Sequence, residues 1–98
     1  MLDKLQGLED KFLDLEARIS DPDIISNQTE WQKYTKAHSK LADIVQVFRE
    51  YKAHMQKIKE DQEIIDAHED AELVEMAEEE LKELKPEVAG YEERLTIL

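Results

Sequence analysis

The chain has 98 residues, of which 41% are apolar and 39% are charged, so it has room for one small domain without a thick hydrophobic core. Its net charge of −12 argues against broad binding to the phosphate backbones of nucleic acids, and we expect no DNA partner, because such binding depends on cationic side chains that displace counterions. The absence of cysteine excludes disulfides and thiolate metal sites, and the sequence contains neither a secretory signal nor the run of about 20 apolar residues that a membrane span needs.

The first predicted helix is amphipathic and lies near the N-terminus. Its apolar residues recur every three or four positions and therefore share one face: Leu2, Leu5, Leu8, Phe12, Leu15 and Ile19. We expect this helix to end in the segment ISDPD, because Pro22 has no backbone N–H and disfavours a helical conformation at Asp21.

The second predicted helix is long and extends from about residue 28 to about residue 67, roughly 60 Å at 1.5 Å per residue. Asn27 is suited to cap its first turn, and no glycine or proline occurs from Asp23 to Lys85. Its apolar face contains Trp31, Tyr34, His38, Leu41, Val45, Phe48 and Met55. We expect Trp31 and Tyr34 to anchor the first helix rather than to stack on a ligand.

The third predicted helix follows the polar segment DAHEDAE, in which Asp70 is the expected N-cap. A heptad pattern follows at Ala77, Leu81, Leu84, Val88, Tyr91, Leu95 and Leu98. We predict that a structural seam is formed by Leu81, Leu84, Val88, Tyr91 and Leu95. Pro86 and Gly90 interrupt the pattern, so a kink is expected rather than a straight rod.

Together these patterns predict an all-α fold for a single domain over residues 1–98. Two long apolar faces joined by a short polar link most simply pack as an antiparallel helical hairpin. The short N-terminal helix is expected to pack on one end of that hairpin, which gives an elongated three-helix domain.

No group of residues has the spacing of a catalytic or metal site. His38, His54 and His68 have no partner histidine or cysteine at a metal-ligand spacing, so we expect them to be structural or solvated. Paired carboxylates such as Glu79 and Glu83 lack the walled pocket that separates the pKa values of a hydrolytic pair. We therefore predict no catalytic residues, no metal, no cofactor and no enzymatic activity.

The most basic local segment is WQKYTKAHSKL, in which Lys33, Lys36 and Lys40 line one face of the predicted helix. Such a stripe could contact the phosphates of a structured RNA, although lysines that merely balance an acidic surface are the more common case. Residues 1–48 carry a net charge of −3 and residues 49–98 a net charge of −9, so an RNA contact is expected in the first half.

The order of these features resembles the N-terminal domain of bacterial class I peptide chain release factors. The resemblance rests on LEARISDPDIIS at the end of the first helix, WQKYTKAHSKL and VFREYK in the second, and DAELVEMAEEELKEL in the third. It covers essentially the whole chain. The opening MLDKLQGLE is more similar to the release factor 1 branch of the family than to the release factor 2 branch.

The resemblance implies a non-catalytic accessory domain that acts in stop-codon-dependent termination of translation in the cytoplasm. The implied partner is the ribosome, at the stalk-base protein and ribosomal RNA, with Lys33, Lys36 and Lys40 as the candidate contact. The release-factor GTPase and the glutamine methyltransferase are further implied partners through the full-length factor. The family's codon-reading and Gly-Gly-Gln loops have no counterpart here, so the central and catalytic domains are expected to lie outside these residues.

One alternative remains open from the residues alone. The chain could be a free-standing acidic coiled-coil adaptor, or a chaperone-like hairpin that binds proteins through its tips. It could also dimerise along seam residues such as Val88 and Leu95.

Overall fold

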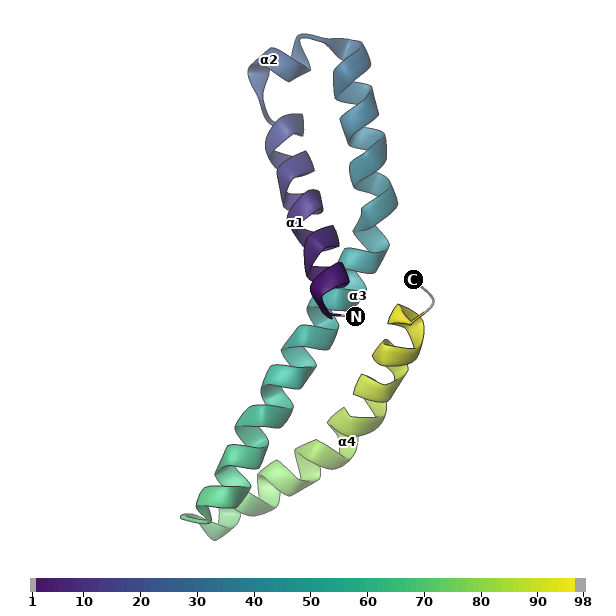
Figure 1. The fold of residues 1–98 in the computed structure, drawn as a ribbon. Coiled ribbons are helices and arrows are strands. Elements are labelled where there is room, and N and C mark those ends of the chain that lie inside the picture. Colours follow the sequence, from purple (N-terminus) through teal and green to yellow (C-terminus); the bar gives the residue numbers. More distant parts are fainter. Residues whose placement is uncertain (1, 97–98) are drawn as a thin grey trace. The chain divides into compact units, whose positions relative to one another are not determined.

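The computed structural model describes residues 2–96, and within this range it contains four helices and no strand (Figure 1). The helices are α1 (Leu2–Ile19), α2 (Pro22–Ile25), α3 (Gln28–Ala67) and α4 (Ala71–Leu95). The predicted all-α fold is confirmed. The chain divides into two compact units, Met1–Gln46 and Val47–Leu98, and α3 contributes residues to both.

The link between α1 and α3 differs from the prediction, because it contains the additional short helix α2. The first helix ends at Ile19 as expected, but Pro22 also opens α2. The backbone of Asp21 is extended, and its side chain accepts a hydrogen bond of 2.9 Å from the N–H of Asp23. Proline suits the first position of a helix, where its missing N–H would have had no intrahelical partner.

Helix α3 extends without interruption from Gln28 to Ala67, as predicted. At its start, the side-chain oxygen of Asn27 accepts a hydrogen bond of 3.3 Å from the N–H of Glu30. This bond satisfies one of the backbone donors that have no partner in the first turn of a helix.

The turn between α3 and α4 lies where the apolar periodicity lapses. His68 has a positive φ of 52°, which takes the backbone out of the right-handed helical region just after α3 ends. The carboxylate of Asp70 then accepts hydrogen bonds from the N–H groups of Glu72 and Leu73, at 2.9 and 3.3 Å. The predicted cap of the last helix is therefore confirmed.

In the first unit, α1 packs against the first part of α3 (Figure 1). The buried apolar side chains of this unit are Leu5, Phe12, Leu15 and Val45. The ring of Phe12 stacks on that of His38 at a centroid distance of 4.1 Å, and the indole N–H of Trp31 donates a hydrogen bond of 3.2 Å to the carbonyl of Ile19. The predicted face of α1 holds except at Leu2, which is 54% exposed.

In the second unit, α4 packs antiparallel to the second part of α3 (Figure 1). Three contacts between the helices give their direction and register. Successively later residues of α3 contact successively earlier residues of α4. The contacts are Tyr51 Oη to Glu92 Oε2 at 3.3 Å, His54 Nε2 to Glu87 Oε2 at 2.6 Å, and Lys57 Nζ to Glu80 Oε1 at 3.5 Å.

The core of the second unit is a continuous apolar seam. Its buried apolar side chains are Val47, Phe48, Tyr51, Val74, Ala77, Leu81, Leu84, Val88 and Leu95. Tyr91 is half-buried, and its ring meets His54 edge-on at a centroid distance of 5.0 Å. Met55, which the periodicity placed on the apolar face of α3, is 43% exposed. Leu98 lies outside the described residues.

Pro86 does not end α4, which continues through both Pro86 and Gly90 to Leu95. Both residues lie on the exposed side of the helix, whereas Leu84 and Val88 on either side of Pro86 are buried. The burial of these neighbours offsets the hydrogen bond that proline removes. Figure 1 shows α4 curved along its length.

One carboxyl group is buried in the seam of the second unit. Asp61 of α3 is only 6% exposed, and among the described residues its Oδ2 atom has no hydrogen-bond partner. Burial raises the pKa of Asp61 to about 6, and the hydrogen bond with Glu80 and the charge of Glu80 contribute to the rise. The positive charge of Lys57 lowers this pKa, and the negative charge of Glu60 raises it slightly further. The hydrogen bond with Asp61 lowers the pKa of Glu80, so Asp61 is the partner that holds the proton more strongly.

The seam can be tested by the change Leu84→Ala. Truncating this buried side chain should lower the free energy of unfolding by roughly 2–5 kcal/mol, because it removes apolar burial and leaves a cavity. Urea denaturation followed by circular dichroism measures the loss. The control Met76→Ala, at a position that is 67% exposed on the same helix, should cost less than about 0.5 kcal/mol. Equal losses for the two variants would contradict the packing described here.

The buried carboxyl can be tested by its pH dependence. The folded-state pKa of Asp61 lies above its ordinary value of 3.8, so the protonated group stabilises the fold at low pH and loses this contribution as the pH rises through about 6. Asp61→Asn should therefore raise the free energy of unfolding by about 1–2 kcal/mol at neutral pH, and by much less near pH 4.

The matched control for this change is Asp43→Asn at an exposed position of α3. Urea denaturation of the wild type and both variants at the two pH values separates the local effect from the general titration of carboxylates. A gain from Asp61→Asn that does not depend on pH would contradict the raised pKa.

Candidate functional site

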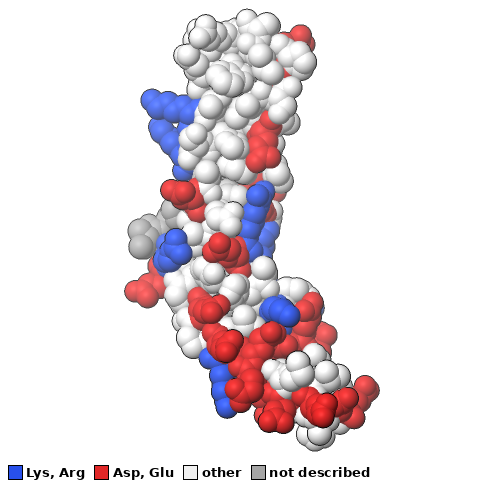
Figure 2. Space-filling model, turned by 180° about the vertical axis from the view of Figure 1, so that it is seen from behind, with Lys and Arg blue, Asp and Glu red and all other residues white. Residues whose placement is uncertain are grey.

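The candidate lysines lie on the exposed side of α3 in the first unit. Lys33, Lys36 and Lys40 are all exposed, and their spacing in a continuous helix places them in one stripe. No aspartate or glutamate occurs from Trp31 to Ala42, so the stripe is a local cationic surface on an acidic chain. Figure 2 shows basic side chains that project from the flank of this unit.

The three lysines, called the lysine stripe below, are exposed because the aromatic residues on the opposite side of α3 pack against α1. Trp31, Tyr34 and His38 each precede one of the three lysines by two positions. Two residues along an α-helix correspond to a rotation of about 200°, so the two stripes face opposite sides of α3. When the aromatic stripe packs towards α1, the lysines necessarily point to solvent.

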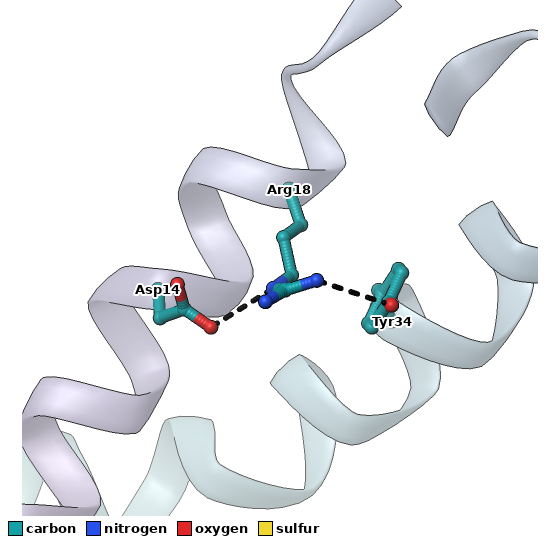
Figure 3. Close-up of polar contacts among 3 residues, drawn as sticks. All are labelled: Asp14, Arg18 and Tyr34. Carbon is teal, nitrogen blue, oxygen red and sulfur yellow. Dashed lines mark hydrogen bonds and ion pairs between the residues drawn. The ribbon is translucent and has the colours of Figure 1, made fainter. Parts of the chain in front are cut away.

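Arg18, near the end of α1, forms a hydrogen bond with the part of α3 that carries the lysines (Figure 3). Its Nε atom donates to Asp14 Oδ2 at 2.9 Å, and its Nη1 atom donates to Tyr34 Oη at 3.2 Å. The guanidinium carbon also lies 5.2 Å from the centroid of the Tyr34 ring, within the range of a cation–π contact. The pair of Asp14 and Arg18 is visible in the sequence as an i, i+4 spacing, but nothing in the sequence indicates Tyr34 as the third partner.

The three histidines occupy different settings. His38 packs on Phe12, and its Nε2 atom lies 3.3 Å from Glu16 Oε1. His54 lies between the two helices of the second unit, with Nδ1 at 2.9 Å from the carbonyl of Glu50. His68 is exposed at the α3–α4 turn. Within residues 2–96, no three His, Cys, Asp or Glu side chains are grouped so that they could hold a metal ion.

The remaining sites considered from the sequence belong to the second unit, whereas the lysine stripe belongs to the first. Glu79 and Glu83 are exposed on α4, and Glu79 pairs with Lys82 at 3.5 Å. The proposed seam residues Leu81, Leu84, Val88, Tyr91 and Leu95 belong to the second unit, whereas the three lysines belong to the first. In the described part of the chain, none of the helices combines the length and the apolar character that crossing a membrane requires.

The chain matches the PCRF domain over residues 8–98. It is 45% identical to "Peptide chain release factor 1" of Clostridium acetobutylicum and 48% identical to the protein of the same name from Clostridioides difficile, in each case over all 98 residues. The protein of that name from Caldicellulosiruptor saccharolyticus is 45% identical over the same length. The chain spans only 27–28% of the length of these relatives. No solved structure matches the chain.

These similarities confirm the resemblance to bacterial peptide chain release factors that the sequence motifs indicated, and they extend over both units. Because the domain match covers nearly the whole sequence, the chain belongs to the PCRF domain family.

Proposed function

We propose that this chain is the N-terminal interaction domain of a peptide chain release factor, and that it helps the factor to associate with the ribosome during translation termination in the cytoplasm. The main support is the identity of 45–48% along all 98 residues with proteins named "Peptide chain release factor 1". The chain is non-catalytic in this proposal, and peptidyl-tRNA hydrolysis is performed by the rest of the factor.

The lysine stripe is the proposed contact with ribosomal RNA. Lys33, Lys36 and Lys40 are exposed on one face of a helix, and the aromatic stripe on its other side holds that helix in place. Three phosphate contacts would give a slope of about −2 to −3 for the logarithm of affinity against the logarithm of salt concentration. Such a contribution suits an accessory contact rather than the main anchor of the factor.

The two units are suited to different partners. The second half of the chain has a net charge of −9, which opposes binding to RNA phosphates. We therefore assign the RNA contact to the first unit, and contacts with protein partners, among them the stalk-base protein, to either unit. The release-factor GTPase and the glutamine methyltransferase would be reached through the full-length factor.

The free-standing adaptor is the less supported alternative. It accounts for the helical hairpins and for the acidic charge, but it does not account for the identity to release factors from one end of the chain to the other.

The test uses a chimera in which these 98 residues replace the matching segment of the Clostridioides difficile relative. The chimera should release peptide from ribosomes halted at a stop codon. Lys33→Glu, Lys36→Glu and Lys40→Glu together should raise the half-saturating concentration of the factor by on the order of tenfold, without changing the maximal rate, because only RNA contacts are lost.

The matched control makes the same charge change at Lys11, Lys59 and Lys85, which are exposed elsewhere on the chain. The control should leave the half-saturating concentration nearly unchanged. Equal effects of the two triple variants would remove the RNA contact from the stripe. A chimera that is folded but releases no peptide would contradict the release-factor function itself.

A further inference from the structure

The second unit carries an exposed apolar patch close to the α3–α4 turn. Its members are Ile64, Leu73 and Met76, which are 36%, 49% and 67% exposed; we call them the tip patch. Ile64 and Leu73 line one open groove of about 520 Å³, and Met76 lines another of about 440 Å³. Large apolar side chains that are exposed close together commonly mark a surface that binds a partner.

Leu73 and Met76, the two members of the tip patch on α4, point away from the packing of the two helices. Val74 and Ala77 are the buried residues of this part of α4, and Leu73 and Met76 each precede one of them by a single position. A step of one residue turns a helix by about 100°, so these two side chains point away from the seam. Because they lie one turn apart, they form a short apolar stripe on the surface of α4.

Acidic side chains surround the tip patch. From Glu60 to Leu81 the sequence contains eleven aspartate and glutamate residues and no lysine or arginine. Seven of the eleven line the two grooves: Glu60, Glu63, Glu69 and Asp70 in the first, and Glu72, Glu75 and Glu79 in the second. Figure 2 shows the acidic side chains gathered around uncoloured surface at the end of this unit that carries the turn.

The ion pairs that flanking lysines form with this segment offset only part of its negative charge. Lys57 pairs with Glu80, and Lys82 pairs with Glu79, each at 3.5 Å. Of the seven acidic residues that line the grooves, only Glu79 takes part in these two ion pairs. The repulsion among the remaining acidic groups would be relieved by cations supplied from outside the chain.

We propose that the tip patch docks a basic amphipathic helix of a partner protein. Such a helix has an apolar stripe flanked by lysine and arginine, which matches an apolar stripe flanked by carboxylates. A second copy of this chain would bring its own eleven acidic residues against the same surface. Nucleic acid and anionic lipid would be repelled in the same way, and an uncharged apolar peptide would leave the carboxylates partly desolvated without partners.

This docking surface goes beyond the function proposed above and does not rest on it. The lysine stripe belongs to the first unit, whereas the tip patch belongs to the second. The tip patch can therefore be tested on the 98-residue chain alone, without a ribosome.

The experiment titrates the isotope-labelled chain with a synthetic lysine–leucine peptide of about five helical turns, in which the leucines share one face. Backbone amide shifts in the nuclear magnetic resonance spectrum should change mainly between residues 60 and 80. A second peptide of the same composition, with its leucines dispersed around the helix, should bind at least about tenfold more weakly, because it cannot bury an apolar stripe.

The double variant Leu73→Gln and Met76→Gln tests the apolar part of the surface. It should weaken binding of the first peptide by about tenfold, because both side chains lose their burial against the peptide. The control Leu13→Gln, at a position that is 48% exposed on α1, should leave the affinity unchanged. Circular dichroism spectra of all variants should remain those of a helical protein, which controls for loss of folding.

A second pair of variants tests the charge. Glu72→Gln, Glu75→Gln and Glu79→Gln together should weaken binding more than Glu30→Gln, Asp43→Asn and Glu93→Gln, which remove the same charge elsewhere. Equal affinity for the two peptides, or equal effects of the test and control variants, would mean that the acidic charge attracts basic peptides without a specific docking surface. Either result would overturn the proposal. Self-association abolished by Leu73→Gln and Met76→Gln, or binding to anionic vesicles, would also overturn it.

Discussion

Burial of apolar side chains along α3 is the interaction on which both units depend. A helix that is isolated in water gains little from its own hydrogen bonds, so most of its stability comes from packing an apolar face. In the first unit α3 supplies Val45 to a core built with α1, and in the second it supplies Phe48 and Tyr51 to the seam with α4. Over residues 2–96, each unit contains one long helix besides its part of α3, so this burial decides which side of those helices faces water.

The same burial determines the character of the exposed surfaces. In the first unit, packing of Tyr34 and its aromatic neighbours towards α1 leaves three lysines in a stripe on the opposite side of α3. In the second unit, the inward positions of Val74 and Ala77 leave apolar side chains uncovered among carboxylates. The described residues thus present one basic and one acidic surface, which suits a domain that works through its contacts.

The sequence predicted most of the helices because the relevant signals are local. Periodicity and the caps Asn27 and Asp70 act within a few residues, and both helix starts were correctly predicted. The short helix α2 was missed because Pro22 was considered only as the end of α1. At Pro86 the sequence predicted a kinked helix, and α4 continues through it because burial on either side outweighs one lost hydrogen bond. The burial of Asp61 was not predicted, because in the sequence this residue cannot be distinguished from the exposed acidic residues around it. Its burial depends on the packing of α4 against α3.

By itself, the sequence determined the all-α class, the extent of α3 and the alignment of Lys33, Lys36 and Lys40 on one face, because helical periodicity relates residues on the same helix. Only the tertiary structure decided that Arg18 meets Tyr34, that Asp61 faces Glu80, and that the tip patch stays uncovered. These contacts join residues of different helices, and their distances depend on which faces pack and in what register. That register is set by the sum of many apolar contacts, none of which can be identified from the spacing within a single helix.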